Sequence, residues 1–179
     1  MYLKKFLISF LILLFGNIVF ADETIKAENN AYRHNNKGLI FLQENYYYGA
    51  IKEFQIAIDL NPNTQASATF YTNLGKTYEK IGYNDLAKNC YENALNLNVL
   101  CFDYYLQLAK IYQKLEMSDA KIQEYKQKNN PLSVVMIGLL HIQKGEVSTG
   151  ITILDEFCNN EEKLLLSKGV RAYLNKITL

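Results

Sequence analysis

The stretch that decides the fold is residues 71–94, which reads YTNLGKTYEKIGYNDLAKNCYENA. Its apolar and small residues recur three or four positions apart on both sides of Gly82, which is the pattern of two amphipathic helices joined by a turn. Gly75 in the first half and Ala87 in the second half are small enough to let two helices approach closely. The stretch therefore predicts a helical hairpin, with Tyr91 filling the space between neighbouring units.

The same pattern recurs along the chain, each time around a small residue in the first helix. These residues are Gly38, Gly75, Ala109 and Gly138. In the third unit the two alanine positions of the second helix hold Lys121 and Lys128, although Tyr125 keeps the aromatic position. The fourth unit starts 29 residues after the third (138 − 109), so the second helix of the third unit must be short.

This pattern resembles the tetratricopeptide repeat family, whose 34-residue unit reads W-x2-L-G-x2-Y…A-x3-F…P. The second unit matches it closely, the first well, and the third and fourth loosely. The units cover residues 31–63, 68–100, 102–130 and 131–160, and His34, Tyr71, Tyr105 and Val134 fill the tryptophan position. The resemblance implies an all-α fold, an α-solenoid of about four helical hairpins. A further helix over residues 161–179 is expected to cap the last hairpin.

Polar residues mark where several of these helices should begin. Asn84-Asp85 and Ser118-Asp119 are expected to cap the second helices of their units. Asn130 followed by Pro131 predicts an N-cap and a first helical position. The final helix is expected to start at residues 160–162, with acids in its first turn.

The N-terminus has the layout of a secretory signal peptide. Lys4 and Lys5 precede an apolar run, and residues 19–21 (Val-Phe-Ala) end it with the small-residue pattern of a cleavage site. We predict cleavage between Ala21 and Asp22, which leaves a polar lead-in over residues 22–30. An uncleaved anchor helix is the alternative, but the run is shorter than the roughly 20 apolar residues of a membrane span. The mature chain is therefore expected to be exported, periplasmic or secreted, and without a membrane span.

Residues that carry chemistry are sparse. The formal net charge is +1, which gives no general attraction to nucleic acid. His34 and His141 have no second ligand at helical spacing, and His141 fills a tyrosine position of its repeat, so a packed core histidine is expected there. We therefore predict no catalytic residue, no metal site and no cofactor.

The three cysteines, Cys90, Cys101 and Cys158, fall in or beside helices. Buried free thiols are expected, because a free cysteine in a helix behaves as a small apolar residue. A disulfide between Cys90 and Cys101 is the alternative.

The family resemblance implies a concave groove, lined by the first helix of each hairpin, that receives a peptide or a helix of a partner protein. The groove residues projected onto this chain are Asn35, Leu39, Leu42, Asn73, Lys76, Lys80, Lys110, Lys114, Leu139 and Ile142. The four lysines fall at the same two offsets in neighbouring units, which predicts a basic stripe between apolar ends. A partner with an acidic centre and apolar ends would suit it. The alternative is that these lysines are ordinary solubilising charges.

The sequence thus predicts an exported protein–protein interaction scaffold or adaptor, set in a bacterial cell envelope. A secreted protein that acts on host or extracellular proteins is the second hypothesis. A helical enzyme is the third, and it would require an activity that a single substitution abolishes.

Overall fold

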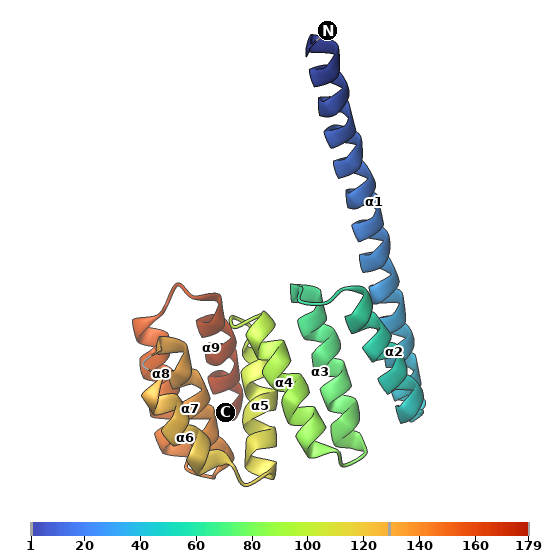
Figure 1. The fold of residues 1–179 in the computed structure, drawn as a ribbon. Helices are drawn as coiled ribbons and strands as arrows, with labels where there is room; N and C mark the ends of the chain where they lie inside the picture. Colours follow the sequence, from blue (N-terminus) through green and yellow to red (C-terminus); the bar gives the residue numbers. More distant parts are fainter. Residues whose placement is uncertain (1, 129, 179) are drawn as a thin grey trace. The chain divides into compact units, whose positions relative to one another are not determined.

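The computed structural model describes residues 2–128 and 130–178, with side chains from residue 23 onward. Within these residues it contains nine helices and no strand (Figure 1), so the predicted all-α fold is confirmed. The helices are α1 (Tyr2–Gln43), α2 (Tyr47–Leu60), α3 (Gln65–Lys80), α4 (Asn84–Leu97), α5 (Phe102–Lys114), α6 (Ser118–Gln127), α7 (Pro131–Gln143), α8 (Val147–Asn160) and α9 (Leu165–Ile177). The chain forms two compact units, Met1–Pro62 and Asn63–Leu179.

The first unit is the hairpin of α1 and α2. Gly38 of α1 lies so close to α2 that a Cβ atom added to it would stand 2.6 Å from Cε1 of Phe54. Ala50 and Ala57 are fully buried on the facing side of α2. The small residues therefore lie where the sequence pattern requires close approach.

The second compact unit, Asn63–Leu179, repeats this packing in its first hairpin, formed by α3 and α4, and in its last hairpin, formed by α7 and α8. A Cβ atom at Gly75 would stand 2.7 Å from the ring of Tyr91, and one at Gly138 would stand 2.7 Å from Cγ of Leu154. These contacts confirm the predicted register of the small residues. They also correct the prediction that Tyr91 fills the space between neighbouring repeats. Its ring packs on Gly75, the glycine of its own hairpin.

The first helix of every hairpin ends in the same turn. The residue seven positions after the small residue has positive φ in each case: Asn45 (59°), Gly82 (82°), Glu116 (57°) and Gly145 (89°). The next residue donates a backbone hydrogen bond back into the helix, as Tyr83 N–H does to Tyr78 O at 2.9 Å and Met117 N–H to Tyr112 O at 2.8 Å. This is the Schellman arrangement, which satisfies carbonyls at a helix end.

These turns explain why two predicted caps are wrong. Helix α4 starts at Asn84 and α6 starts at Ser118, and neither helix has a side-chain cap. The residues expected as caps are already in the first turn, because the tight connection leaves no room for a separate cap. By contrast, Asn130 is the predicted cap of α7: its side chain accepts the Leu132 N–H at 3.0 Å and Pro131 follows it.

The third hairpin departs from the others. Helix α6 has ten residues, as short as the spacing predicts. Helices α5 and α6 touch each other far less than α3 and α4 do, and α7 packs against both of them. Lys121 stands between them with its Nζ 5.0 Å from the ring centroid of Tyr112, in the position that Ala87 fills in the second hairpin. The two helices are thus apart where a long side chain stands in place of the alanine.

The last helix differs from its prediction in its start and in its neighbours. Helix α9 begins at Leu165, because α8 continues to Asn160 and a turn held by the Glu161 carbonyl follows. That carbonyl accepts Ser167 Oγ–H at 2.6 Å. Besides covering α8, α9 crosses to the start of α5, where the rings of Phe102 and Tyr173 lie 5.4 Å apart. The main core of the second unit therefore runs from α3 to α9.

Candidate functional site

The clearest concentration of exposed charge in the predicted groove lies on α3 and α5 of the second unit. We call it the α3–α5 charged face, and it consists of Lys76, Glu79, Lys80, Asp103, Lys110 and Lys114. All four lysines are exposed. The equal offsets of Lys76 and Lys80 on α3 and of Lys110 and Lys114 on α5 place them side by side, because repeated units present the same positions to the same surface.

This face is of mixed sign and is not a purely basic stripe. Lys76 Nζ lies 3.7 Å from Asp103 Oδ2, and Lys114 Nζ lies 3.7 Å from Glu79 Oε1, so both ion pairs link α3 to α5. Four lysines minus two carboxylates leave a net charge of +2 on the face. Ion pairs this exposed contribute little to stability, so these side chains exchange partners at small cost.

Lys80 and Lys110 have no ion pair in the part of the chain that the structure describes. The Glu79 carboxylate, by contrast, is held in place by the buried Tyr91, whose Oη–H donates to its Oε2 at 2.6 Å. Burial and this hydrogen bond raise the pKa of the Tyr91 hydroxyl, which therefore stays a donor. The face thus combines two lysines that have no ion pair within the described residues with a carboxylate that is held in place.

The remaining predicted groove residues are less available to a partner. Leu139 is fully buried and Asn35 is 6% exposed, while Leu39, Leu42, Asn73 and Ile142 are half-buried. Leu139 is covered because α7 packs against α5, α6 and α8. This corrects the expectation for Leu139, which belongs to the core, whereas Ile142 stays half-buried.

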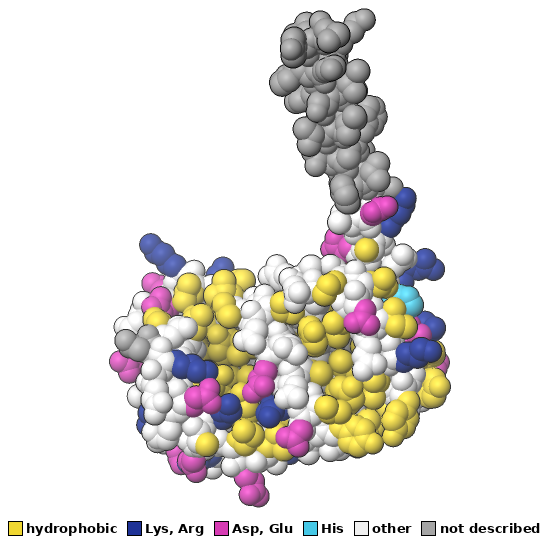
Figure 2. Space-filling model, in the orientation of Figure 1, with side chains coloured by type: hydrophobic (Ala, Val, Ile, Leu, Met, Phe, Trp, Pro, Cys, Tyr) yellow, Lys and Arg dark blue, Asp and Glu magenta, His cyan; other side chains and the backbone are white. Residues whose placement is uncertain are grey.

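The face of the second unit that Figure 2 shows carries both signs of charge. Figure 2 shows basic and acidic side chains lying among each other over these helices, with apolar side chains between them. Lys144 illustrates this, with its Nζ 2.5 Å from Asp119 Oδ1 and 3.0 Å from Glu146 Oε1. Such a surface favours a partner of matching pattern over a broadly acidic polymer.

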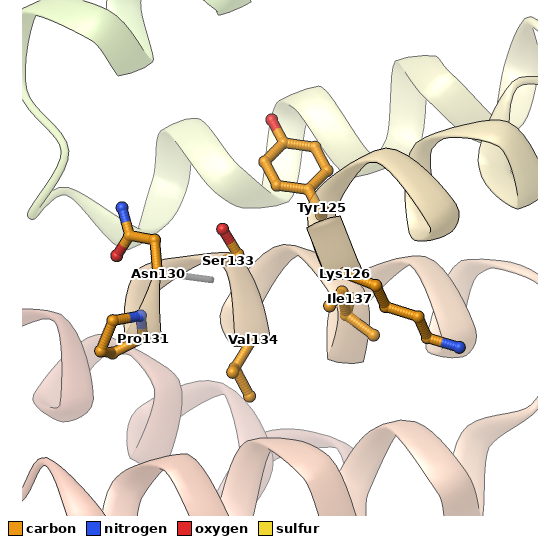
Figure 3. Close-up of a pocket in the computed structure, with 7 residues that line it drawn as sticks. All are labelled: Tyr125, Lys126, Asn130, Pro131, Ser133, Val134 and Ile137. Carbon is orange, nitrogen blue, oxygen red and sulfur yellow. The ribbon is translucent and has the colours of Figure 1, made fainter. Parts of the chain in front are cut away.

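A hollow of about 460 Å³ lies where α6 meets α7. It is lined by Tyr125, Lys126, Asn130, Pro131, Ser133, Val134 and Ile137 (Figure 3). Tyr125 and Ser133 point to one side of α7 and Val134 to the other. The hollow lies at the end of the short helix α6, and the sequence analysis did not predict it.

A second unforeseen feature is a charged cluster in the first hairpin. Glu53 of α2 is 6% exposed, yet it holds two partners from α1. Its Oε2 lies 2.6 Å from His34 Nδ1, and its Oε1 accepts from Lys37 Nζ at 2.6 Å. Burial works to raise the pKa of the Glu53 carboxyl, but the bonds from Lys37 and His34 outweigh it and hold this pKa below its ordinary value. The sequence carries one signal of this cluster, because Glu53 occupies the repeat position that Cys90 fills in the second hairpin.

Both histidines have carboxylate partners. His141 is half-buried, and its Nδ1 bonds to Glu146 in the turn that follows α7. It is therefore not the packed core histidine that was expected, because the Schellman turn brings Glu146 to the ring.

The cysteines are free thiols, as expected. Cys90 and Cys158 are buried and Cys101 is half-buried. Burial raises the pKa of the Cys90 thiol to about 12, so this thiol is neutral and inert.

The predicted cleavage site, Ala21 and Asp22, lies outside the residues whose side chains the structure describes. Among the residues that it does describe, no helix has an apolar stretch long enough to cross a bilayer.

Comparison with known proteins identifies the repeats. The tetratricopeptide repeat family model matches residues 31–64 and 68–98, which are the first two hairpins. A segment of 84 residues, 45% of this chain, is 27% identical to anaphase-promoting complex subunit CDC16 of Saccharomyces cerevisiae. That match spans only 10% of the length of the yeast protein.

Solved structures share the fold. MamA superposes with a TM-score of 0.51 at 21% identity, covering 79% of this chain and 85% of MamA. YrrB, described as a tetratricopeptide-repeat protein with an unusual peptide-binding site, superposes with a TM-score of 0.52 at 17% identity, covering 80% of this chain and 75% of YrrB. For PilF of Pseudomonas aeruginosa the TM-score is 0.51 at 19% identity, covering 80% of this chain and 67% of PilF. At these identities the likeness concerns the fold alone.

Proposed function

This chain is a tetratricopeptide-repeat protein, and from that premise we propose that it is a scaffold that holds an acidic peptide or helix of a partner protein on the α3–α5 charged face. Tetratricopeptide repeats generally serve as non-catalytic interaction platforms, and YrrB is described as having a peptide-binding site. The observation that carries the proposal is the pair of exposed lysines, Lys80 and Lys110, on a face whose other charges are already paired.

The chemistry of the partner follows from this arrangement. Carboxylates of the partner would meet Lys80 and Lys110 without first displacing a protein carboxylate, and a basic side chain of the partner would meet Glu79 or Asp103. Such complementarity raises the association rate and selects the register of the bound segment more than it adds raw affinity. The partner we propose is therefore acidic at its centre, with a basic residue nearby.

The setting is part of the proposal. The N-terminal pattern of lysines, apolar run and Val-Phe-Ala supports export, and we place the scaffold in a bacterial cell envelope. Release from the cell, with a host or extracellular protein as partner, is the second candidate. N-terminal sequencing of the native protein tests the cleavage after Ala21, and cell fractionation separates retention in the envelope from release into the medium.

The binding test is a crosslinking capture from native cells with two matched quadruple variants. One changes Lys76, Lys80, Lys110 and Lys114 to Glu. The control changes Lys52, Lys126, Lys163 and Lys168 to Glu, which are exposed, have no ion pair within the described residues, and give the same change in net charge. We expect a partner that the wild type and the control capture and the first variant loses.

A pair of double variants then locates the contact within the face. Lys80→Gln with Lys110→Gln should weaken binding more than Lys76→Gln with Lys114→Gln, because the second pair is already neutralised by carboxylates. Equal capture by all variants would move the binding surface elsewhere and leave these lysines as solubilising charges.

A further inference from the structure

We infer that α1 carries an oxyanion-binding site formed by Asn30, Arg33, His34 and Lys37, which takes a carboxylate or phosphate group. The site belongs to the first hairpin and uses none of the residues of the α3–α5 charged face. It would therefore bind a second ligand, or a second group of the same partner, independently of the proposed function.

The four residues converge by their spacing. Positions 30, 33, 34 and 37 are three or four residues apart, so they share one face of the helix. Together they line a hollow of about 340 Å³. Each side chain carries N–H donors, and the lining contains no carboxylate. A hollow that is lined by the cations Arg33 and Lys37 and by N–H groups of Asn30 and His34, with no carboxylate in its lining, suits an anion.

Beneath this hollow, Glu53 fixes two of the donors. It takes His34 Nδ1 on one oxygen and Lys37 Nζ on the other, each at 2.6 Å. With Nδ1 held by the carboxylate, Nε2 is the ring nitrogen left for a ligand, and it donates to an anion in the imidazolium form of the ring. Donors whose orientation is already set bind an anion without losing rotamer freedom at that moment.

The second hairpin shows that this cluster is not required by the fold. The positions of His34, Lys37 and Glu53 correspond there to Tyr71, Leu74 and Cys90, and the latter two are 5% and 6% exposed core residues. An apolar set packs this part of the hairpin without any buried charge. Burying a carboxylate is costly unless it is paired and hydrogen-bonded. The first hairpin therefore carries a polar cluster where the repeat itself needs only apolar packing.

The charge balance also favours an anion. Glu53 is buried under the hollow, whereas Arg33 and Lys37 are exposed at its surface. Arg33 has no ion pair within residues 23–128 and 130–178, so its guanidinium is available for a bidentate contact with an oxyanion. Lys37 also lies over the ring of Phe41 at 5.4 Å, which keeps its stem in place.

The test is an NMR titration of the folded full chain, followed through its two histidine rings. Inorganic phosphate and sodium acetate are added in separate series, with the ionic strength held constant by sodium chloride. We expect saturable shifts of the His34 resonances and none at His141, whose ring pairs with Glu146. Arg33→Gln should weaken the binding about tenfold, because it removes a charge-assisted bidentate partner. Lys52→Gln, which removes the same charge from an exposed position of α2, should leave it unchanged.

The two series identify the ligand. Saturation by phosphate alone assigns the site to a phosphate group, saturation by acetate alone to a carboxylate, and saturation by both to either oxyanion. Shifts that grow linearly and equally in both variants would mean an adventitious ion only, and they would overturn the inference. His34 resonances that do not shift in either series would also overturn the inference. The cluster would then have only a structural role in the hairpin. Neither result bears on capture by the α3–α5 charged face.

Discussion

The second and third hairpins have the same turn and the same repeat register, but they pack differently. In the second, Ala87 is fully buried and α3 lies close against α4. In the third, Lys121 stands at that position, α5 and α6 are apart, and α7 packs against both. The first helices keep the same aromatic residue, Tyr78 and Tyr112, and differ at the small residue, Gly75 and Ala109, whereas the second helices exchange a small residue for a lysine.

This difference shows how much of a repeat depends on a small side chain. The stem of Lys121 fills the gap it creates, while its ammonium reaches Glu124 Oε2 at 2.8 Å and the face of the Tyr112 ring. A lysine is tolerated there because its apolar stem is buried and its charged end reaches a partner. Because α5 and α6 contact each other little, both pack against α7 instead. The third repeat therefore depends on the first helix of the fourth repeat for its packing.

Exchanging the residue in the tight hairpin should have the largest effect. We expect Ala87→Lys to lower the free energy of unfolding by roughly 4 kcal/mol, because it overpacks a closed contact and buries a cation without a partner. Urea denaturation followed by circular dichroism measures this. Asn89→Lys, on the exposed side of the same helix, is the control and should stay within about 0.5 kcal/mol of the wild type. A small loss for Ala87→Lys would show that the second hairpin opens as readily as the third.

The reverse exchange should cost less. Lys121→Ala removes the stem that fills the gap and the contact with the Tyr112 ring, and we expect a loss of about 1 kcal/mol in the free energy of unfolding. Lys126→Ala, on the exposed side of the same helix, should change little. A gain in stability for Lys121→Ala would mean that α5 and α6 close once the lysine is gone, and the lysine would then be an obstacle and not a filler.

The sequence could predict the hairpins because small residues at fixed spacing leave few packing choices. Gly75 and Gly138 lie in contact with the opposite helix as the pattern requires. The position of α9 could not be predicted, since its contact with Phe102 depends on how the splayed third hairpin turns the helices that follow. For the same reason Leu139, predicted as a groove residue, is buried. The burial of Glu53 was not predicted, because its one sequence signal, the repeat position that Cys90 fills in the second hairpin, shows itself only when the two hairpins are aligned residue by residue.

The turns offer a smaller test of the same two hairpins. Gly82 and Glu116 are equivalent and both have positive φ, but only glycine takes this conformation without steric strain. We expect Glu116→Gly to raise the free energy of unfolding by about 0.5 kcal/mol and Gly82→Ala to lower it by about 1 kcal/mol. Both changes in the free energy of unfolding are measured from the midpoints of urea denaturation, with the dependence on urea concentration held at the wild-type value. A destabilising Glu116→Gly would show that the glutamate side chain contributes more than the strain costs.

The smallest expected effect concerns the charges that replace apolar packing in α6. Hydrogen bonds from Lys121 and Lys128 lower the pKa of the Glu124 carboxyl, against a weaker opposing effect of burial. A carboxyl whose pKa is lower in the folded state stabilises the fold above its ordinary pKa, and this contribution disappears as the pH falls through the lowered value. The wild type should therefore exceed Glu124→Gln by roughly 0.5 kcal/mol near neutral pH, as exposed ion pairs do. This difference in the free energy of unfolding should disappear below pH 4. The control is Glu116→Gln, which removes a carboxylate without an ion pair in the described residues and should show no such difference from the wild type. A difference that persists in acid would assign the stabilisation to the packing of the Glu124 stem and not to its charge.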